Sequence, residues 1–300
     1  NNSVTISTFN DSGTEAGTIT VDANATDLTG INVPTLGRKL TLFASENIII
    51  NQTISTSGGP LEIELSAQGN VQIKNNADII TLGGTFDVTG SRDDGDADAG
   101  GDATAAGSFL LDSGSEIKTE GGSTARAGGD VTIKTTVRSA SLASATDGDI
   151  EIKGTITTDG GTATAAGLDG GAVNMTAGVE GTTAGTITIF SGANINTIGS
   201  AAASSSNANG GAGGAVTLNT HEETIVLTDT QIDSTGGAKD GGGTAGAGGT
   251  ITISDNLSIL DGDSSGVVLT SGATAGNVVL SGTVDGGTTL SLTSGTGSLT

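Results

Sequence analysis

A six-residue pattern, Ile-x-Thr/Ser-x-Gly-Gly/Ser, recurs six times along this chain. Its copies begin at Ile54, Ile79, Ile117, Ile156, Ile195 and Ile232. The positions of successive isoleucines therefore differ by 25, 38, 39, 39 and 37 residues. A repeat of this length, made of short strands and glycine turns, is typical of a solenoid, in which each repeat contacts only its neighbours. We therefore expect residues 1–300 to form a single solenoid segment.

Two other kinds of short segment precede the copies in a fixed order, and both alternate apolar and polar residues. The first kind follows a glycine and comprises Leu40/Leu42, Leu61/Ile63, Phe86/Val88, Val131/Ile133, Val173/Met175, Val216/Leu218, Ile251/Ile253 and Leu290/Leu292. The second kind comprises Ile48/Ile50, Val71/Ile73, Phe109/Leu111, Ile150/Ile152, Ile187/Ile189, Ile225/Leu227 and Val278/Leu280. We interpret Val284 as the start of a shortened third-kind copy, and residues 257–275 fit no phase.

Period-two alternation places the apolar residues of each segment on one face. Segments this short do not form long hairpins, so each is expected to stack on its counterpart in the next repeat. The sequence thus predicts an all-β parallel β-helix, with three sheets around one apolar column. Counting the first-kind segments and the earlier apolar pairs Val4/Ile6 and Ile19/Val21 gives about eight or nine turns.

Glycines mark the expected corners between sheets, where tight turns favour positive φ. Insertions rich in Gly, Ala, Ser and Thr fall at one equivalent corner, at 121–130, 160–172, 199–215 and 236–249. Insertions at equivalent corners of a solenoid form a ridge along one face. Two interpretations stay open: floppy loops, or extended glycine-rich segments that become ordered by packing on each other.

Composition excludes several classes of protein. Phased apolar residues, 34% of the chain, argue against disorder despite 52 glycines. A net charge of −23 opposes binding to nucleic acid or to anionic lipid. No apolar run approaches the ~18 residues of a membrane-spanning helix. The chain has no cysteine, and its start has no initiator Met or signal peptide, so we interpret it as a mature or excised piece of something longer.

One acidic segment is the candidate metal site. Asp94, Asp96 and Asp98 alternate, and Asp93 and Asp102 lie nearby. Hard oxygen ligands at this density suit Ca²⁺, although the segment lacks the spacing of an EF-hand loop. The alternative is a solvated acidic insertion. Calcium is therefore a candidate ligand, and no other cofactor is expected.

The sequence offers little for catalysis. His221 is the single histidine and lies in a polar segment between expected strands, and there is no cysteine nucleophile. A hydrolytic triad needs a histidine held between a nucleophile and an acid, and one loop histidine does not indicate such a site. We expect no enzyme, although parallel β-helices also carry polysaccharide-cleaving activities.

The repeats resemble a known family. Residues 40–59, which end in Ile54-Ser-Thr-Ser-Gly-Gly59, and residues 61–84 are similar to repeats of the filamentous haemagglutinin-type exoproteins. Residues 282–299 resemble repeats of giant bacterial surface adhesins of the same kind. The resemblance implies a right-handed parallel β-helix that is secreted and held at or beyond the bacterial cell surface. The Asn-Pro-type motif of the family's secretion domain is absent from this chain.

Together these features predict the structural shaft of an extracellular bacterial fibre or adhesin, used for extension, attachment or self-association. Expected partners are further copies, joined end-to-end or laterally, and a host-cell, neighbouring-cell or glycan surface. The alternatives are a polysaccharide-active β-helix enzyme and a calcium- or glycan-binding module.

Overall fold

The computed structural model describes residues 3–8, 17–22, 28–33, 37–67, 69–89, 107–123, 125–135, 148–178, 185–262, 265–272 and 274–300. All structural statements below concern these residues.

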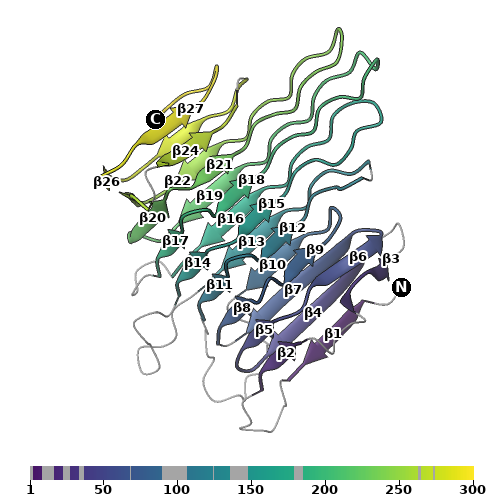
Figure 1. Cartoon of the computed structure of the whole chain (residues 1–300), viewed down its shortest axis with the longest axis vertical. Coiled ribbons are helices and arrows are strands. Elements are labelled where there is room, and N and C mark those ends of the chain that lie inside the picture. Colours follow the sequence, from purple (N-terminus) through teal and green to yellow (C-terminus); the bar gives the residue numbers. More distant parts are fainter. Residues whose placement is uncertain are drawn as a thin grey trace, which may run out of the picture.

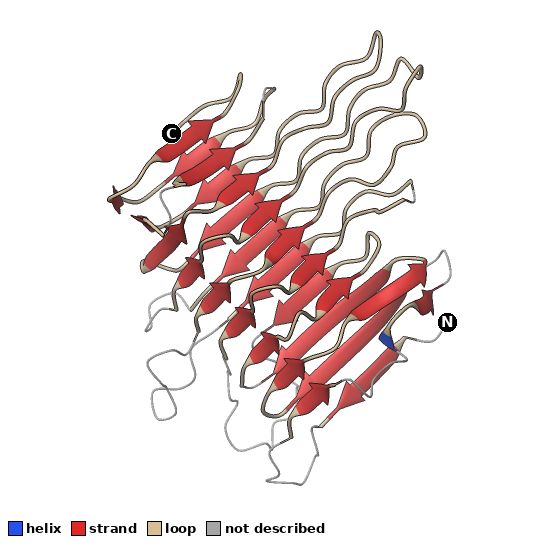
Figure 2. Cartoon of the chain, viewed as in Figure 1, coloured by secondary structure: helices blue, strands red, loops and turns tan. Residues whose placement is uncertain are grey.

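The chain forms a right-handed parallel β-helix of about nine turns, which confirms the predicted fold class. Each turn visits three sheets in the same order, and each sheet contains nine strands. The turns stack into one elongated body, in which successive strands of a sheet lie side by side (Figure 1). Nearly all of the regular structure consists of short strands joined by loops (Figure 2).

The strands of the three sheets have the following bounds. The first sheet contains β1 (Val4–Ser7), β4 (Arg38–Ala44), β7 (Leu61–Ala67), β10 (Phe86–Thr89), β13 (Val131–Lys134), β16 (Val173–Thr176), β19 (Val216–Asn219), β22 (Ile251–Ile253) and β25 (Val278–Leu280). The second contains β2 (Ile19–Val21), β5 (Ile48–Ile50), β8 (Val71–Ile73), β11 (Phe109–Leu111), β14 (Ile150–Ile152), β17 (Ile187–Ile189), β20 (Thr224–Thr228), β23 (Asn256–Leu260) and β26 (Val284–Gly286). The third contains β3 (Ile31–Val33), β6 (Ile54–Gly58), β9 (Asp78–Ile80), β12 (Glu116–Lys118), β15 (Thr155–Thr157), β18 (Asn194–Asn196), β21 (Gln231–Asp233), β24 (Val267–Thr270) and β27 (Leu290–Thr293).

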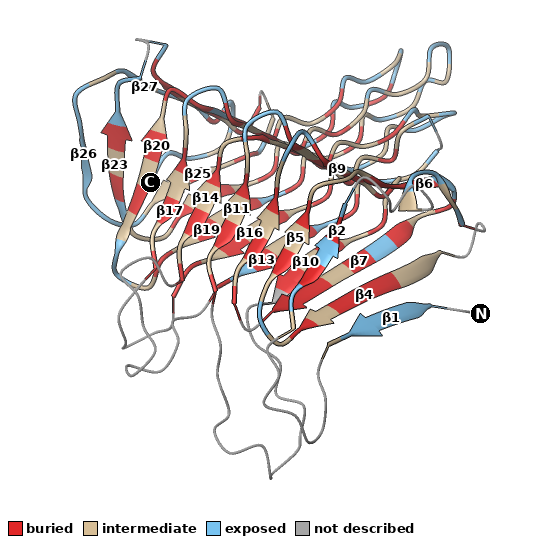
Figure 3. Cartoon of the chain, turned by 60° about the horizontal axis from the view of Figure 1, so that its bottom comes forward, coloured by how far each residue is buried: buried red, intermediate tan, exposed pale blue. Residues whose placement is uncertain are grey.

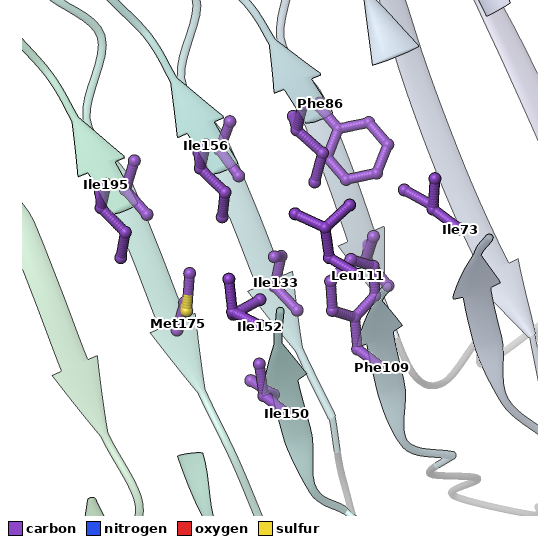
Figure 4. Close-up of a cluster of buried hydrophobic side chains, with 14 of the residues drawn as sticks. Ile73, Phe86, Phe109, Leu111, Ile133, Ile150, Ile152, Ile156, Met175 and Ile195 are labelled. Atoms are coloured by element: carbon purple, nitrogen blue, oxygen red, sulfur yellow. The ribbon is translucent and has the colours of Figure 1, made fainter. Parts of the chain in front are cut away.

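The core is the apolar column that the alternation predicts. In β14, Ile150 and Ile152 are buried, and Glu151 between them is half-buried and faces outward. The same alternation recurs in strands such as β11 and β17, whereas β1 and β26 at the two ends of the helix are exposed throughout (Figure 3). Side chains of all three sheets meet in the column, where Phe86 and Phe109 are its largest fully buried members (Figure 4). β-Branched residues dominate because they fit a pleated surface that is packed on one side.

The repeated isoleucines form one file on the third sheet, as predicted. Each pairs in register with the next, in the order Ile54, Ile79, Ile117, Ile156, Ile195 and Ile232. All six are fully buried. The file continues through Leu269 and Leu292, which align with Ile232 in the two following turns.

The sequence-based assignment is wrong in the last turn and a half. Val278/Leu280 lie in the first sheet rather than the second, Val284 lies in the second rather than the third, and Leu290/Leu292 lie in the third rather than the first. The cause is that 257–275 contains most of β23 and all of β24, two strands that were not assigned. The copy of the repeated pattern in β24 is Leu269-Thr-Ser-Gly272. It has leucine in place of isoleucine, and it lacks the residue that separates Thr or Ser from glycine in the other copies.

Candidate functional site: a glycine-rich fin and the groove at its base

The four glycine-rich insertions project from the corner between the third and first sheets and lie alongside one another (Figure 1). We call them arm 1 (121–130), arm 2 (160–172), arm 3 (199–215) and arm 4 (236–249), and together the glycine-rich fin. Each arm has an outgoing segment that leaves the third sheet and a return segment that leads to the first sheet.

The arms are joined by backbone hydrogen bonds that recur every third residue. In the outgoing segment of arm 3, the N–H groups of Gly199 and Ala202 donate to carbonyls of the next turn, each at 2.9 Å. In its return segment, Gly210 and Gly213 do the same at 2.9 and 2.8 Å. A step of three matches the polyproline II helix, which has three residues per turn. Of the two interpretations left open by the sequence, the structure supports ordered, mutually packed extended segments.

The intervening N–H groups point in other directions. Gly211 donates to Ser200 of the same arm at 2.9 Å, and Gly214 donates to Thr197 at the base of that arm at 2.7 Å. Ala212 donates to the Asp169 carboxylate of arm 2 at 2.7 Å. Successive backbone donors of one segment therefore bind the next arm, their own arm and an outward-facing side chain in rotation.

The close approach of the arms explains the glycine spacing of arm 4. A Cβ atom on Gly243, Gly246 or Gly249 would lie 2.1, 1.8 or 2.0 Å from a carbonyl oxygen of arm 3, whereas real Cβ contacts stay beyond about 3.0 Å. None of these three glycines has positive φ. The expectation of positive φ is therefore wrong for them, although it is confirmed at corner glycines such as Gly114 and Gly192.

A buried hydroxyl closes the base of every arm. In arm 2, the Thr158 side chain donates to the Gly171 carbonyl at 2.5 Å, and the Gly171 N–H donates back to the Thr158 carbonyl at 2.7 Å. Equivalent bonds run from the third position of the repeated pattern to the glycine that precedes the first sheet: Thr56–Gly59, Thr81–Gly84, Thr119–Gly129, Thr197–Gly214 and Ser234–Gly249. We call this pair of bonds the hydroxyl clamp.

An open groove of about 480 Å³ lies where arms 1, 2 and 3 leave the helix. Its polar side chains are Glu120, Ser123, Asp159, Thr162 and Ser200, and glycine backbone forms much of the remainder. Glu120 and Asp159 occupy the position after the clamp hydroxyl in consecutive turns, which brings the two carboxylates onto the same side of the groove.

The electrostatics of the groove centre on Asp159. Burial, reinforced by the negative charges of Glu120, Asp233 and Glu116, raises the pKa of Asp159 to about 6, although the Ile198 N–H that it accepts at 2.7 Å opposes this shift. Nearby, Lys118 binds Glu116 at 2.6 Å, and this hydrogen bond raises the pKa of Lys118. The groove therefore offers the Glu120 and Asp159 carboxylates, of which Asp159 exchanges its proton near pH 6, together with three hydroxyls.

The five aspartates of the predicted calcium site are not described by the structure. Asp93, Asp94, Asp96, Asp98 and Asp102 lie outside the described residues, so the calcium site stays a prediction. In the part of the chain that is described, no three His or acidic side chains are grouped as metal ligands.

His221 lies in the corner between β19 and β20 with a φ of 50°. Its N–H donates to the Asn219 side chain at 2.9 Å. The Asp255 carboxylate accepts the N–H groups of Thr220 and Glu222 on either side of it, at 2.7 and 3.0 Å. These bonds hold the corner together.

Sequence reasoning missed two features. The clamp hydroxyls were visible as the invariant Thr or Ser of the repeated pattern, but its third position was not interpreted. The second feature is a set of inter-turn bonds, in which the Asn47 and Asn70 side chains accept backbone N–H groups of the following turn at 2.8 and 3.0 Å. An Asn or Asp recurring beside a strand start is the signal that could have revealed these inter-turn bonds.

A comparison of the chain with protein-family models, with curated proteins and with solved structures finds no match. Across the described ranges, the structure contains no helix with the length and apolar character needed to cross a membrane.

Proposed function

We propose that this chain is a structural segment of an extracellular bacterial fibre or adhesin. Its role is to provide length and to display a surface, rather than to catalyse a reaction. The observation that supports this best is the uninterrupted isoleucine and leucine file, which runs in one register from Ile54 to Leu292. In such an array each turn is stabilised by its neighbours, and the length grows by ~4.8 Å with each added turn.

The surface chemistry is consistent with this role. The net charge of −23 keeps a long apolar column soluble, because it disfavours indiscriminate association between copies. The fin is the exception, since arm 3 has no charged residue and arm 4 has only Lys239 and Asp240, whose charges cancel. Lateral self-association of the shaft is therefore expected through the fin.

Immunogold electron microscopy of the producing cells tests the proposal. An antibody raised against this segment should label extended material beyond the cell envelope. Label confined to the cytoplasm, with no extended material, would overturn it.

The groove supports a second candidate, a glycan-binding module, because carboxylates and hydroxyls pair well with sugar hydroxyl groups. Calorimetry with soluble glycans, comparing the intact chain with Glu120→Gln, separates the two functions. Measurable binding that the substitution weakens favours the glycan module, and an absence of binding leaves the structural shaft.

A further inference from the structure

The glycine-rich fin ends at arm 4, and this end is an open hydrogen-bonding edge. In the next turn β24 ends at Thr270 and β25 begins at Val278, so only a short corner follows arm 4. That corner covers the base of the arm, where the Gly248 N–H donates to Thr274 at 2.7 Å. Arm 4 is the outermost of the long arms, drawn in light green (Figure 1).

The N–H groups of two exposed residues of arm 4, Lys239 and Ala245, lie at this edge without an acceptor among the described residues. The hydrogen-bond register aligns Lys239 with Ala202 of arm 3, and Ala245 with Gly210 of arm 3. In arm 3 both donors are used, to Ala238 and Thr244, each at 2.9 Å. In arm 4 the N–H groups of Lys239 and Ala245 make no hydrogen bond to any described residue, and both residues are exposed. We call these two donors and the surface around them the fin edge.

We propose that the fin edge binds an extended polypeptide segment that carries glycine at every third position. The inference rests on continuity with an interface that the chain already forms. Arm 4 packs on arm 3 by accepting the N–H groups of Ala202 and Gly210. The fin edge presents the same two donors, one arm further along. An open backbone edge is a template for another segment of the same conformation.

The glycine requirement follows from the packing distance. Arm 4 lies so close to arm 3 that Gly243 and Gly246, three residues apart, each have a carbonyl oxygen where a Cβ would be, at 2.1 and 1.8 Å. A segment that approaches the fin edge equally closely needs glycine at the same interval. The charges of arm 4 cancel, so the segment needs no compensating charge.

This proposal is independent of the shaft function, because it concerns a backbone edge that any protein with this fin would present. It is tested on the full chain by amide hydrogen exchange, with a synthetic peptide of repeated Gly-Ala-Ser units as the probe. A peptide of repeated Ala-Ala-Ser units is the control. We expect the glycine peptide alone to slow exchange at Lys239 and Ala245.

Two proline variants localise the binding. Ala245→Pro removes a donor of the fin edge and no existing hydrogen bond. Ala247→Pro removes an N–H that has no acceptor among the described residues and that aligns with the outward-facing N–H of Ala212, so it is the matched control. Both variants should keep the Gly210 and Gly213 amides protected, which reports an intact fin. We expect about tenfold weaker peptide binding for Ala245→Pro alone, from a lost hydrogen bond and the bulk of the ring. The proposal is overturned if exchange is unchanged at millimolar peptide, if both peptides act equally, or if both variants bind equally.

Discussion

The hydroxyl clamp of arm 2 can be tested by a single substitution, Thr158→Val. The exchange keeps the shape of the side chain and replaces the hydroxyl with a methyl group. Thr158 is fully buried, and its hydroxyl donates to the Gly171 carbonyl at 2.5 Å. The valine leaves that carbonyl without its donor at a buried position.

The magnitude follows from two opposing contributions. A buried carbonyl that loses its hydrogen bond costs about 1–3 kcal/mol. Burial of the added methyl offsets up to about 0.8 kcal/mol of this. For a loss in the middle of this range, about 2 kcal/mol, the net destabilisation is about 1–2 kcal/mol, concentrated at the base of the arm. Since 1.4 kcal/mol is tenfold in an equilibrium constant, local opening there should become roughly 5- to 30-fold more frequent.

Amide hydrogen exchange at Gly171 is the appropriate assay, because its N–H donates to the Thr158 carbonyl and forms the other half of the clamp. Thr162→Val is the matched control, since Thr162 is exposed on the same arm and its hydroxyl has no hydrogen-bond partner among the residues that the structure describes. Thr158→Ser should retain the protection, as the chain already uses Ser234 in this role at 3.0 Å. Equal exchange rates at Gly171 in Thr158→Val and Thr162→Val would refute the reasoning.

Three further predictions concern packing, pH and calcium. Gly171→Ala should destabilise the fold by about 2–3 kcal/mol in urea unfolding, because its Cβ would lie 2.2 Å from the Gly129 carbonyl oxygen. Gly287→Ala, where a Cβ meets nothing within 4 Å, should be neutral, and an equal effect of both would contradict the packing argument. The pKa of Asp159, raised to about 6, lies above its unfolded value, so the folded state binds the proton more tightly and gains stability as the pH falls from about 7 to about 4. Asp159→Asn should therefore be more stable than the parent at pH 7.5 and equal to it near pH 4, and a gap that persists at pH 4 would exclude this origin. If residues 93–102 bind calcium, a chelator should lower the melting temperature, whereas Asp94→Asn combined with Asp96→Asn should abolish that response. An identical melt with and without millimolar Ca²⁺ would leave the solvated-insertion interpretation.

The fold was predictable from the sequence because its repeated unit is short and alternates with period two. The alternation of residues around Ile156 predicts that its side chain is buried. The recurrence of the pattern at Ile195 and Ile232 predicts that the three isoleucines stack in successive turns. The prediction failed where Leu269 replaces isoleucine and one residue is deleted, because the phase was followed by pattern alone. In the structure the repeat continues through this region, because the backbone hydrogen bonds between turns do not depend on which apolar residue occupies the buried position.

The fin was less predictable. Gly, Ala and Ser in an insertion are compatible with floppy loops and with close packing, and composition cannot separate the two. The distinction depends on the register between arms, such as Gly213 against Gly248, which only the stacked turns provide. The pKa of Asp159 likewise arises from charges on neighbouring turns, and these are 39 or more residues away in the chain.

Because of the hydroxyl clamp, the geometry of the β-helix at a corner does not depend on the length of the arm inserted there. The same side-chain bond spans three residues at Thr56 and Thr81, and 10, 13, 17 and 15 residues at the bases of arms 1 to 4. The two clamped residues therefore meet in the same way whether a tight corner or a long excursion lies between them. Because the entropy of closing a loop rises only slowly with its length, the corner can accept inserted segments at small cost to the turns above and below. Such a corner is a natural point for lineages to diverge, and for foreign sequences to be grafted without redesigning the rod.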